Sequence, residues 1–264
     1  MKRIFLKLFF LIFSLISIGC SIENNTKPNI IWIVAEDQSQ YFFPYYGDNT
    51  IELPNINKLL ENGTVYEDMS SPYPVCAPAR SSIITGMYPN SIGTGHQRAY
   101  HYNREVRPES EYLLEFQYYS SKLAEQIKPF TQILRENGYY TTNNSKQDYN
   151  FKLTDDAWDE SSREASWENR NKDQPFFSVF NFGVTHESQI WNRDKQELKV
   201  NPDNIIVPPI FPNDSIARHS LAVNYSNIIE MDRQMGEIID KLIEQDLYED
   251  SYIFFYSDHG GPFP

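Results

Sequence analysis

Short apolar runs alternate with helical patterns along this chain. Three runs, Asn29–Ala35, Phe176–Phe182 and Ser251–Tyr256, are rich in β-branched and aromatic residues, and a shorter run, Tyr139–Thr142, follows a glycine-ended helical pattern. Continuous apolar runs of this length are typical of strands that are buried on both faces of a parallel sheet. We therefore predict a central, mostly parallel sheet built from these four segments.

The segments between the predicted strands carry start and stop signals for helices. Residues Pro54–Asn62 begin with proline and end before a glycine, and residues 131–138 end in glycine. The longest pattern lies around His219–Gln245, where apolar residues recur at three- and four-residue spacing, so its stripe faces the core. Residues Thr64–Met69 alternate like a second strand. This order predicts an α/β fold with helices flanking the sheet.

Two long segments fit neither pattern. Residues Asp155–Lys172 and Trp191–Asn213 are polar, charged or proline-containing, and we expect them to form surface loops of the kind that often contact substrates.

Ligands of open α/β sheets gather beyond the carboxyl ends of the strands. Glu36-Asp37 follows the first predicted strand and Asp258-His259 follows the last. We expect these two pairs of oxygen and imidazole ligands to meet at one edge of the sheet.

Residues 1–19 have the pattern of an export signal. A basic start precedes the apolar stretch from Leu8 to Ile18, which is shorter than the roughly 20 residues of a membrane-spanning helix. Gly19 directly before Cys20 resembles a bacterial lipobox, which implies lipidation of Cys20 and export to the periplasm or cell envelope with a lipid anchor in the membrane. Ordinary secretion remains the alternative, because both signals share the charged and apolar regions.

Residues 20–28 then form a tether, and residues 29–264 are long enough for one large core. The net charge of −13 gives a nucleic-acid partner no electrostatic support, so we expect none. An anionic substrate remains compatible with this charge, because a few local cations can decide the field inside a cleft.

The pentapeptide from Cys76 to Arg80 is the strongest chemical signal. Pro78 suits a first helical turn and Gly86 a helix end, so Cys76 lies at a helix N-terminus, where free N–H groups and the helix dipole favour an anion. Arg80 lies four positions on, hence on the same face. The chain has two cysteines, and Cys20 has a separate explanation, so we expect no disulfide at Cys76.

The sequence C-A-P-A-R followed by S-S-I-I-T-G-M-Y-P resembles the signature of the type I, formylglycine-dependent sulfatases. The resemblance implies an alkaline phosphatase-like fold and hydrolysis of sulfate esters or sulfamates. It also implies that a formylglycine-generating or radical maturation enzyme oxidises Cys76 to Cα-formylglycine during export. The hydrated aldehyde would attack sulfur and form a covalent sulfate intermediate.

The same resemblance implies a metal site. Glu36 and Asp37 match the family's first acidic pair, Asp258 and His259 match the D-[HN]-G motif, and the residue at position 76 completes the ligands. An oxygen-rich set suits a hard divalent cation, Ca²⁺ by family precedent, with Mg²⁺ as an alternative. The family more often has aspartate at position 36, and a strand-end glutamate can instead cap the following turn.

Other site residues also follow from the resemblance. Lys146 matches a sulfate-binding lysine and His186 a histidine that protonates the leaving group, while Arg80 stabilises sulfate charge. Asp148 replaces the family's histidine two positions after the lysine. Taken alone, Lys146 would be a solvated loop lysine and His186 a structural histidine.

Two further residues, His96 and Arg98 in G-T-G-H-Q-R, could bind substrate or pack a loop.

The motifs N-N-S-K-x-D-Y-N and T-H-E-S resemble bacterial sulfatases grouped near the N-sulfoglucosamine sulfohydrolases, which implies a sulfated glycan such as a glycosaminoglycan as substrate. A phosphate or phosphonate monoester hydrolase of the same superfamily and a non-catalytic, glycan-binding lipoprotein are the alternatives. Family members continue beyond position 264 with another sulfate-binding lysine and a C-terminal subdomain. We therefore expect residues 29–264 to be an incomplete catalytic domain with reduced activity.

Overall fold

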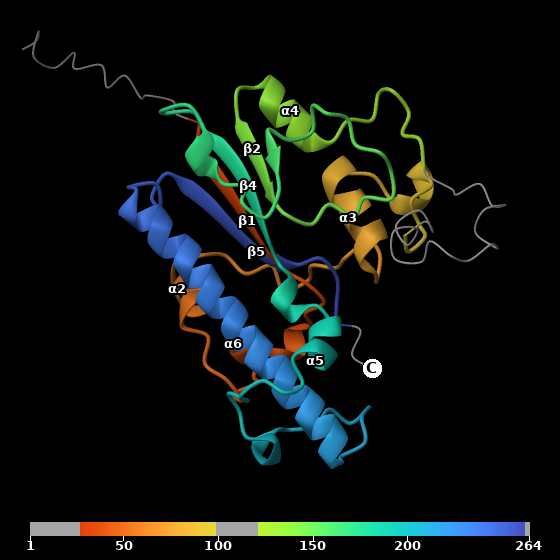
Figure 1. Cartoon of the computed structure of the whole chain (residues 1–264), viewed down its shortest axis with the longest axis vertical. Helices are drawn as coiled ribbons and strands as arrows, with labels where there is room; N and C mark the ends of the chain where they lie inside the picture. The colour runs from red at the N-terminus through yellow and green to blue at the C-terminus, as the bar shows by residue number, and fades with distance from the viewer. Residues whose placement is uncertain (1–26, 99–120, 262–264) are drawn as a thin grey trace, which may run out of the picture.

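A five-stranded parallel sheet forms the centre of the computed structural model, which describes residues 27–98 and 121–261 (Figure 1). The strand order is β3-β2-β4-β1-β5, and every pairing is parallel. The strands are β1 (Asn29–Ala35), β2 (Tyr140–Asn144), β3 (Glu160–Ser161), β4 (Phe176–Phe182) and β5 (Ser251–Ser257). The structure confirms the predicted α/β fold with a mostly parallel central sheet.

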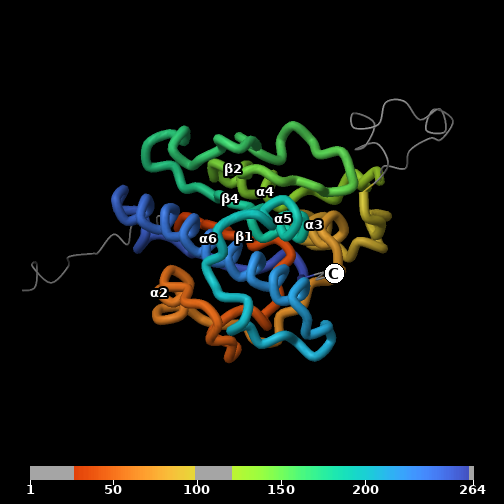
Figure 2. Tube along the Cα trace, turned by 60° about the horizontal axis from the view of Figure 1, so that its bottom comes forward, coloured from red at the N-terminus to blue at the C-terminus, as the bar shows by residue number. Residues whose placement is uncertain are grey.

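Helices cover both faces of the sheet (Figure 1). The α-helices are α2 (Pro54–Asn62), α3 (Cys76–Thr85), α4 (Phe130–Glu136), α5 (Ser188–Asn192) and α6 (Ser215–Glu244). Short 3-10 turns are η1 (Gln40–Phe42), η2 (Pro44–Tyr46), η3 (Pro89–Ile92), η6 (Trp167–Asn169), η7 (Gly183–Thr185) and η8 (Pro202–Asn204). The turned view in Figure 2 again shows α2 and α4 on opposite sides of β1.

The alternation of side chains along β1 divides the core into two layers. Ile31 and Ile33 are fully buried in the cluster that includes Leu221 of α6, whereas Trp32 packs in a second cluster with Phe130 of α4. Successive side chains of a strand point to opposite faces, so an uninterrupted apolar run supplies both layers at once. This is why β1 and β4 lack a polar face.

Helix α6 is 30 residues long and begins before the predicted His219. The Asp214 carboxylate accepts hydrogen bonds from the backbone N–H groups of Ile216 at 3.0 Å and Ala217 at 2.9 Å. This N-cap satisfies two donors that the first turn leaves unpaired and sets the start of the helix.

The strand predicted at Thr64–Met69 is wrong. The segment has no regular structure, and the side chains of Tyr66 and Met69 are 73% and 78% exposed. Its alternating residues pair with no strand in the described part of the chain, and a strand needs such a neighbour to satisfy its backbone groups.

The segments predicted as surface loops also contain ordered parts. Residues 155–172 include β3 and the fully buried Trp167, and residues 191–213 include the turn η8. Within residues 27–98 and 121–261, no helix has the length and apolar character needed to cross a membrane.

Candidate active site

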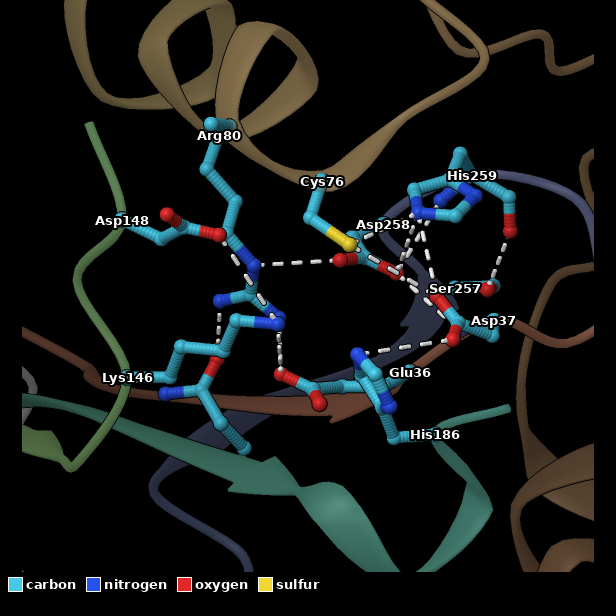
Figure 3. Close-up of polar contacts among 12 residues, drawn as sticks. Glu36, Asp37, Cys76, Arg80, Lys146, Asp148, His186, Ser257, Asp258 and His259 are labelled. Carbon is cyan, nitrogen blue, oxygen red and sulfur yellow. Dashed lines mark hydrogen bonds and ion pairs between the residues drawn. The ribbon is translucent and has the colours of Figure 1, made fainter. Parts of the chain in front are cut away.

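Two strand ends and one helix start converge on Cys76 (Figure 3). Ala35 of β1 lies opposite Ser257 of β5, so the residues that follow each strand emerge side by side. Cys76 is the first residue of α3, and Gly86 ends this helix with φ +67°, a conformation that glycine adopts without strain. The Cys76 Sγ lies 3.2 Å from His259 Nε2 and 3.7 Å from Asp37 Oδ1.

Four buried side chains at this junction could hold a metal ion. One candidate ligand atom from each lies within 4.8 Å of the others. The group consists of Asp37, Cys76, Asp258 and His259. Two carboxylates and an imidazole can coordinate a divalent cation, and carboxylates are preferred by hard cations.

Hydrogen bonds and nearby charges set protonation inside this group. Burial raises the pKa of Asp37, but hydrogen bonds from His259 and the Glu187 backbone hold it at about 2. For His259, burial lowers the pKa, while hydrogen bonds with Asp37 and Cys76 raise it to about 10. Without a metal, the buried Asp37 charge is thus balanced by a protonated His259.

The Cys76 thiol is buried but acidic. Burial raises its pKa, yet hydrogen bonding with His186 and His259 and the charge of Lys146 together lower it to about 7. Such an environment favours an anion at position 76.

Arg80 is held by three partners on different elements. Its side chain donates to Glu36 at 2.9 Å, to Asp258 at 3.0 Å and to Asn181 at 2.6 Å. Arg80 is 5% exposed. Burial lowers its pKa, but Asp258 and Glu36 raise it above the usual value, so the guanidinium stays charged.

Glu36 lies beside this group without being part of it. Its carboxylate pairs with Arg80 at 2.9 Å and with Lys146 Nζ at 3.0 Å. The structure therefore brings Lys146 to the site, and metal ligation by Glu36 stays a prediction.

His186 follows β4 and the turn η7 at the same edge of the sheet. Its Nδ1 lies 2.9 Å from Ser188 Oγ, and its Nε2 lies 3.8 Å from Asp37 Oδ2. Hydrogen bonding with Cys76 raises the pKa of His186 despite its partial burial. His186 thus faces the same space as Cys76.

His96 and Arg98 lie on the loop after η3. Arg98 binds Asp148 through two hydrogen bonds, and the His96 carbonyl accepts one from Asn150. Cys20, the predicted lipidation site, and the signal at residues 1–19 lie outside the described residues.

Two site residues were missed by sequence reasoning. Asn181 contacts Arg80, and the Gln97 side chain accepts a hydrogen bond at 3.2 Å from the Ala77 N–H at the start of α3. The only sequence signal for Asn181 was a polar residue within the apolar run Phe176–Phe182.

Comparisons with known proteins give the family. The sulfatase family model matches residues 28–263. An ulvan-active sulfatase of Formosa agariphila is 36% identical over 273 residues, which cover 90% of this chain and 44% of the relative. The human N-sulphoglucosamine sulphohydrolase is 20% identical, covering 90% of this chain and 52% of the relative. The chain thus spans about half the length of these curated relatives.

Solved structures agree on the fold. A protein from a Bacteroides thetaiotaomicron locus for glycosaminoglycan metabolism has a TM-score of 0.63 at 17% identity, covering 89% of this chain and 61% of that chain. The phosphonate monoester hydrolase of Agrobacterium radiobacter has a TM-score of 0.60 at 13% identity, covering 88% and 62%. These likenesses establish the alkaline phosphatase-like fold. With the family model matching nearly all of it, the chain belongs to the sulfatase family.

Proposed function

We propose that this protein hydrolyses sulfate esters or sulfamates on a sulfated glycan. The observation that carries the proposal is the position of Cys76: it begins α3, contacts His259 at 3.2 Å, and lies in a group that could hold a metal. A curated relative is named an ulvan-active sulfatase, which supports a sulfated polysaccharide as the substrate class.

Asp37, Asp258 and His259 would hold a divalent cation, Ca²⁺ or alternatively Mg²⁺, with Glu36 as a further candidate ligand. The buried carboxylates fit such an ion, and Arg80 and His259 balance their charge without it. When bound, the metal supplies Lewis acidity, and conversion of Cys76 to formylglycine supplies a hydrated aldehyde as nucleophile. A maturation enzyme is therefore a required partner.

The remaining residues have distinct roles. Arg80 and Lys146 provide fixed positive charge for the sulfuryl oxygens, which is most effective in a water-excluded site. His186 would give a proton to the departing oxygen or nitrogen, a role supported by the interaction of its imidazole with Cys76. His96 and Arg98 are substrate-binding residues on the neighbouring loop.

We place the protein in the periplasm or cell envelope, exported by residues 1–19 and anchored in the membrane by a lipid on Cys20. The basic and apolar signal and the lipobox-like Gly19-Cys20 support this location.

The decisive test combines maturation with turnover. The full chain is expressed with and without a formylglycine-forming enzyme, the Cys76 peptide is analysed by mass spectrometry, and sulfate release from ulvan oligosaccharides is measured. We expect an aldehyde at position 76 and calcium-dependent release only after co-expression, and none from Cys76→Ala. An intact thiol with retained glycan binding would instead favour the non-catalytic, glycan-binding lipoprotein.

A phosphate or phosphonate monoester hydrolase is the second candidate, favoured by the structural likeness to the Agrobacterium enzyme. Rates on an aryl sulfate and on the matching aryl phosphonate separate the two functions. A higher kcat/KM for the phosphonate would overturn the sulfatase proposal.

A further inference from the structure

An arginine and an aspartate from two loops form a clamp beside the candidate active site. Arg98 Nε donates to Asp148 Oδ1 at 2.8 Å, and Arg98 Nη2 donates to Asp148 Oδ2 at 2.6 Å. Paired hydrogen bonds of this kind fix both the direction and the plane of a guanidinium. Neither residue belongs to the four-residue group that could hold a metal.

Both loops are held firmly at this point. The Asn150 side chain donates to the carbonyls of Thr94, at 3.1 Å, and of His96. Gln97, the residue before Arg98, accepts from the Ala77 N–H of α3 at 3.2 Å. The clamp therefore has a fixed place relative to Cys76, the neighbour of Ala77.

Three non-glycine residues here have left-handed backbone conformations. Arg98, Asp148 and Asn150 have φ angles of 50°, 58° and 54°. Such conformations are unfavourable for non-glycine residues and persist where surrounding contacts enforce them, frequently at functional sites. Their concentration at one clamp indicates a place where position matters more than local stability.

The two members of the clamp differ in exposure. The Arg98 side chain is 35% exposed, whereas that of Asp148 is 9% exposed. The charges of Cys76 and Glu36 also act on Arg98. Asp148 thus holds in place a guanidinium that solvent, and so a substrate, can reach.

The charge of the clamp indicates what it can bind. Asp148 neutralises Arg98 and also lies 3.9 Å from Lys146 Nζ, whose nearer partner is Glu36 at 3.0 Å. The paired guanidinium and carboxylate carry no net charge together, and the remaining N–H groups of Arg98 lie beside free lone pairs of the Asp148 carboxylate. These groups match adjacent hydroxyl groups of a sugar as donor and acceptor.

We propose that Asp148 is a positioning residue that directs Arg98 onto the hydroxyl groups of the sugar carrying the reacting sulfate, so that the clamp selects glycans. This rests on the proposed sulfatase function and adds a residue, Asp148, that the family motif does not assign. The clamp acts on the sugar, whereas Lys146 and Arg80 act on the sulfate.

The test uses the full, calcium-loaded chain as wild type, Arg98→Lys, Asp148→Asn and the double variant. Dissociation constants for an ulvan oligosaccharide and for inorganic sulfate are measured by calorimetry, together with the melting temperature. The matched control is Arg135→Lys, because the Arg135 side chain, 29% exposed, pairs with Asp159 at 2.9 Å near the opposite end of β2.

We expect each single variant to weaken oligosaccharide binding about tenfold and the double variant to add less than about threefold, because the two residues act as a unit. Binding of inorganic sulfate should stay close to wild type, and the melting temperatures show that each variant is folded at the temperature of the measurement. Arg135→Lys should change neither affinity.

Four outcomes would overturn the proposal: unchanged oligosaccharide affinity in Asp148→Asn, multiplicative losses in the double variant, an equal loss of sulfate affinity, or no oligosaccharide binding by wild type. The proposed function fails separately, if the matured wild type binds the oligosaccharide with the expected variant pattern but releases no sulfate. If sulfate release is insensitive to Asp148→Asn, only the proposal for the clamp is overturned, and the proposed function stands.

Discussion

At the scale of single residues, Arg80 balances negative charge in the candidate site. Two buried carboxylates, Glu36 and Asp258, depend on its guanidinium at 2.9 and 3.0 Å. Removing one partner of a buried ion pair leaves an uncompensated charge and costs about 3–5 kcal/mol. Arg80→Ala should therefore lower the free energy of unfolding by about that amount, measured in urea with a chelator present.

Arg135→Ala is the control for this prediction, since Arg135 forms a partly exposed pair with Asp159. It should cost about 1 kcal/mol or less. Equal losses in the two variants would show that burial of the Arg80 pairs is not what stabilises the site.

Metal binding gives a second prediction at this scale. Because the candidate ligand atoms lie within 4.8 Å of one another in the folded chain, an ion held there should bind the folded state in preference to the unfolded state. Calcium at 100 times its dissociation constant would then add about 2.7 kcal/mol to the free energy of unfolding. Thermal melts with and without calcium should show this gain in the wild type and little of it in Asp258→Asn. Identical melts of the wild type in calcium, magnesium and chelator would contradict the assignment.

Site residues could be predicted from sequence where they follow a strand or begin a helix. Asp37, Asp258 and Cys76 occupy such positions, and parallel pairing of β1 with β5 brings the strand ends together. Asn181 was not predicted, because its contact with Arg80 joins a strand and a helix that are distant in sequence, and no local pattern encodes such a contact.

At the scale of elements, one aspartate joins two helices that are distant in sequence. Asp232 of α6 is 3% exposed and accepts hydrogen bonds from the backbone N–H groups of Asn55 at 3.2 Å and Ile56 at 2.8 Å, at the start of α2. It therefore caps the first turn of α2 from a distance, in place of the N-cap residue Leu53, whose side chain makes no cap hydrogen bond. A Cβ at Gly236 would lie 2.6 Å from the side-chain nitrogen Nδ2 of Asn55. Glycine at this position therefore permits the close approach of the Asn55 side chain to α6.

Asp232→Ala should lower the free energy of unfolding by about 2 kcal/mol, because it removes a cap and leaves the backbone N–H groups of Asn55 and Ile56 without this partner. Chemical denaturation measures the change, and Asp240→Ala, on the same helix but exposed, is the control. A loss no larger than that of the control would mean that α2 is held by its apolar contacts alone.

The exposed side of α6 provides a pH-dependent prediction. Glu230 accepts hydrogen bonds from Arg233 at 2.7 and 2.9 Å, and these lower its pKa from 4.5 to about 2. A carboxyl with a depressed folded-state pKa stabilises the fold above its unfolded pKa, and this contribution is lost as the pH falls from about 4.5 towards 2. Glu230→Gln should thus melt slightly below wild type at pH 7, and the difference should shrink towards pH 3. A gap that widens on acidification would contradict the sign.

Element prediction succeeded where one local signal was sufficient and failed where it was not. Strands β1 and β4 and helix α2 have the predicted bounds, because buried strands and proline-to-glycine helices are encoded locally. Residues Thr64–Met69 have the alternation of a strand, but pairing depends on a neighbour that local sequence does not specify.

At the scale of the whole molecule, the residues of the candidate site lie at one edge of the sheet, and the two apolar clusters on its faces stabilise the fold. Strands β1 and β4 contribute side chains to the apolar clusters on both faces. Because the strands are held in this way, the positions of the residues that follow them are fixed as well. His186 and Asp37 thereby lie 3.8 Å apart although they are 149 positions apart in sequence.

Strand β5, in contrast to β1 and β4, lies at the edge of the sheet. It is last in the strand order and pairs, within the described residues, with β1 alone. Tyr252 and Phe254 on this strand are 62% and 47% exposed. An apolar edge strand with free backbone groups can pair with another chain.

The 264-residue chain should therefore self-associate with rising concentration, and Phe254→Lys should reduce this association. Sedimentation velocity over a concentration series tests the prediction, with Ile133→Lys on α4, where an equally exposed apolar residue lies away from the edge, as the control. Equal effects of the two lysines would assign the association to general surface apolarity rather than to the edge of the sheet.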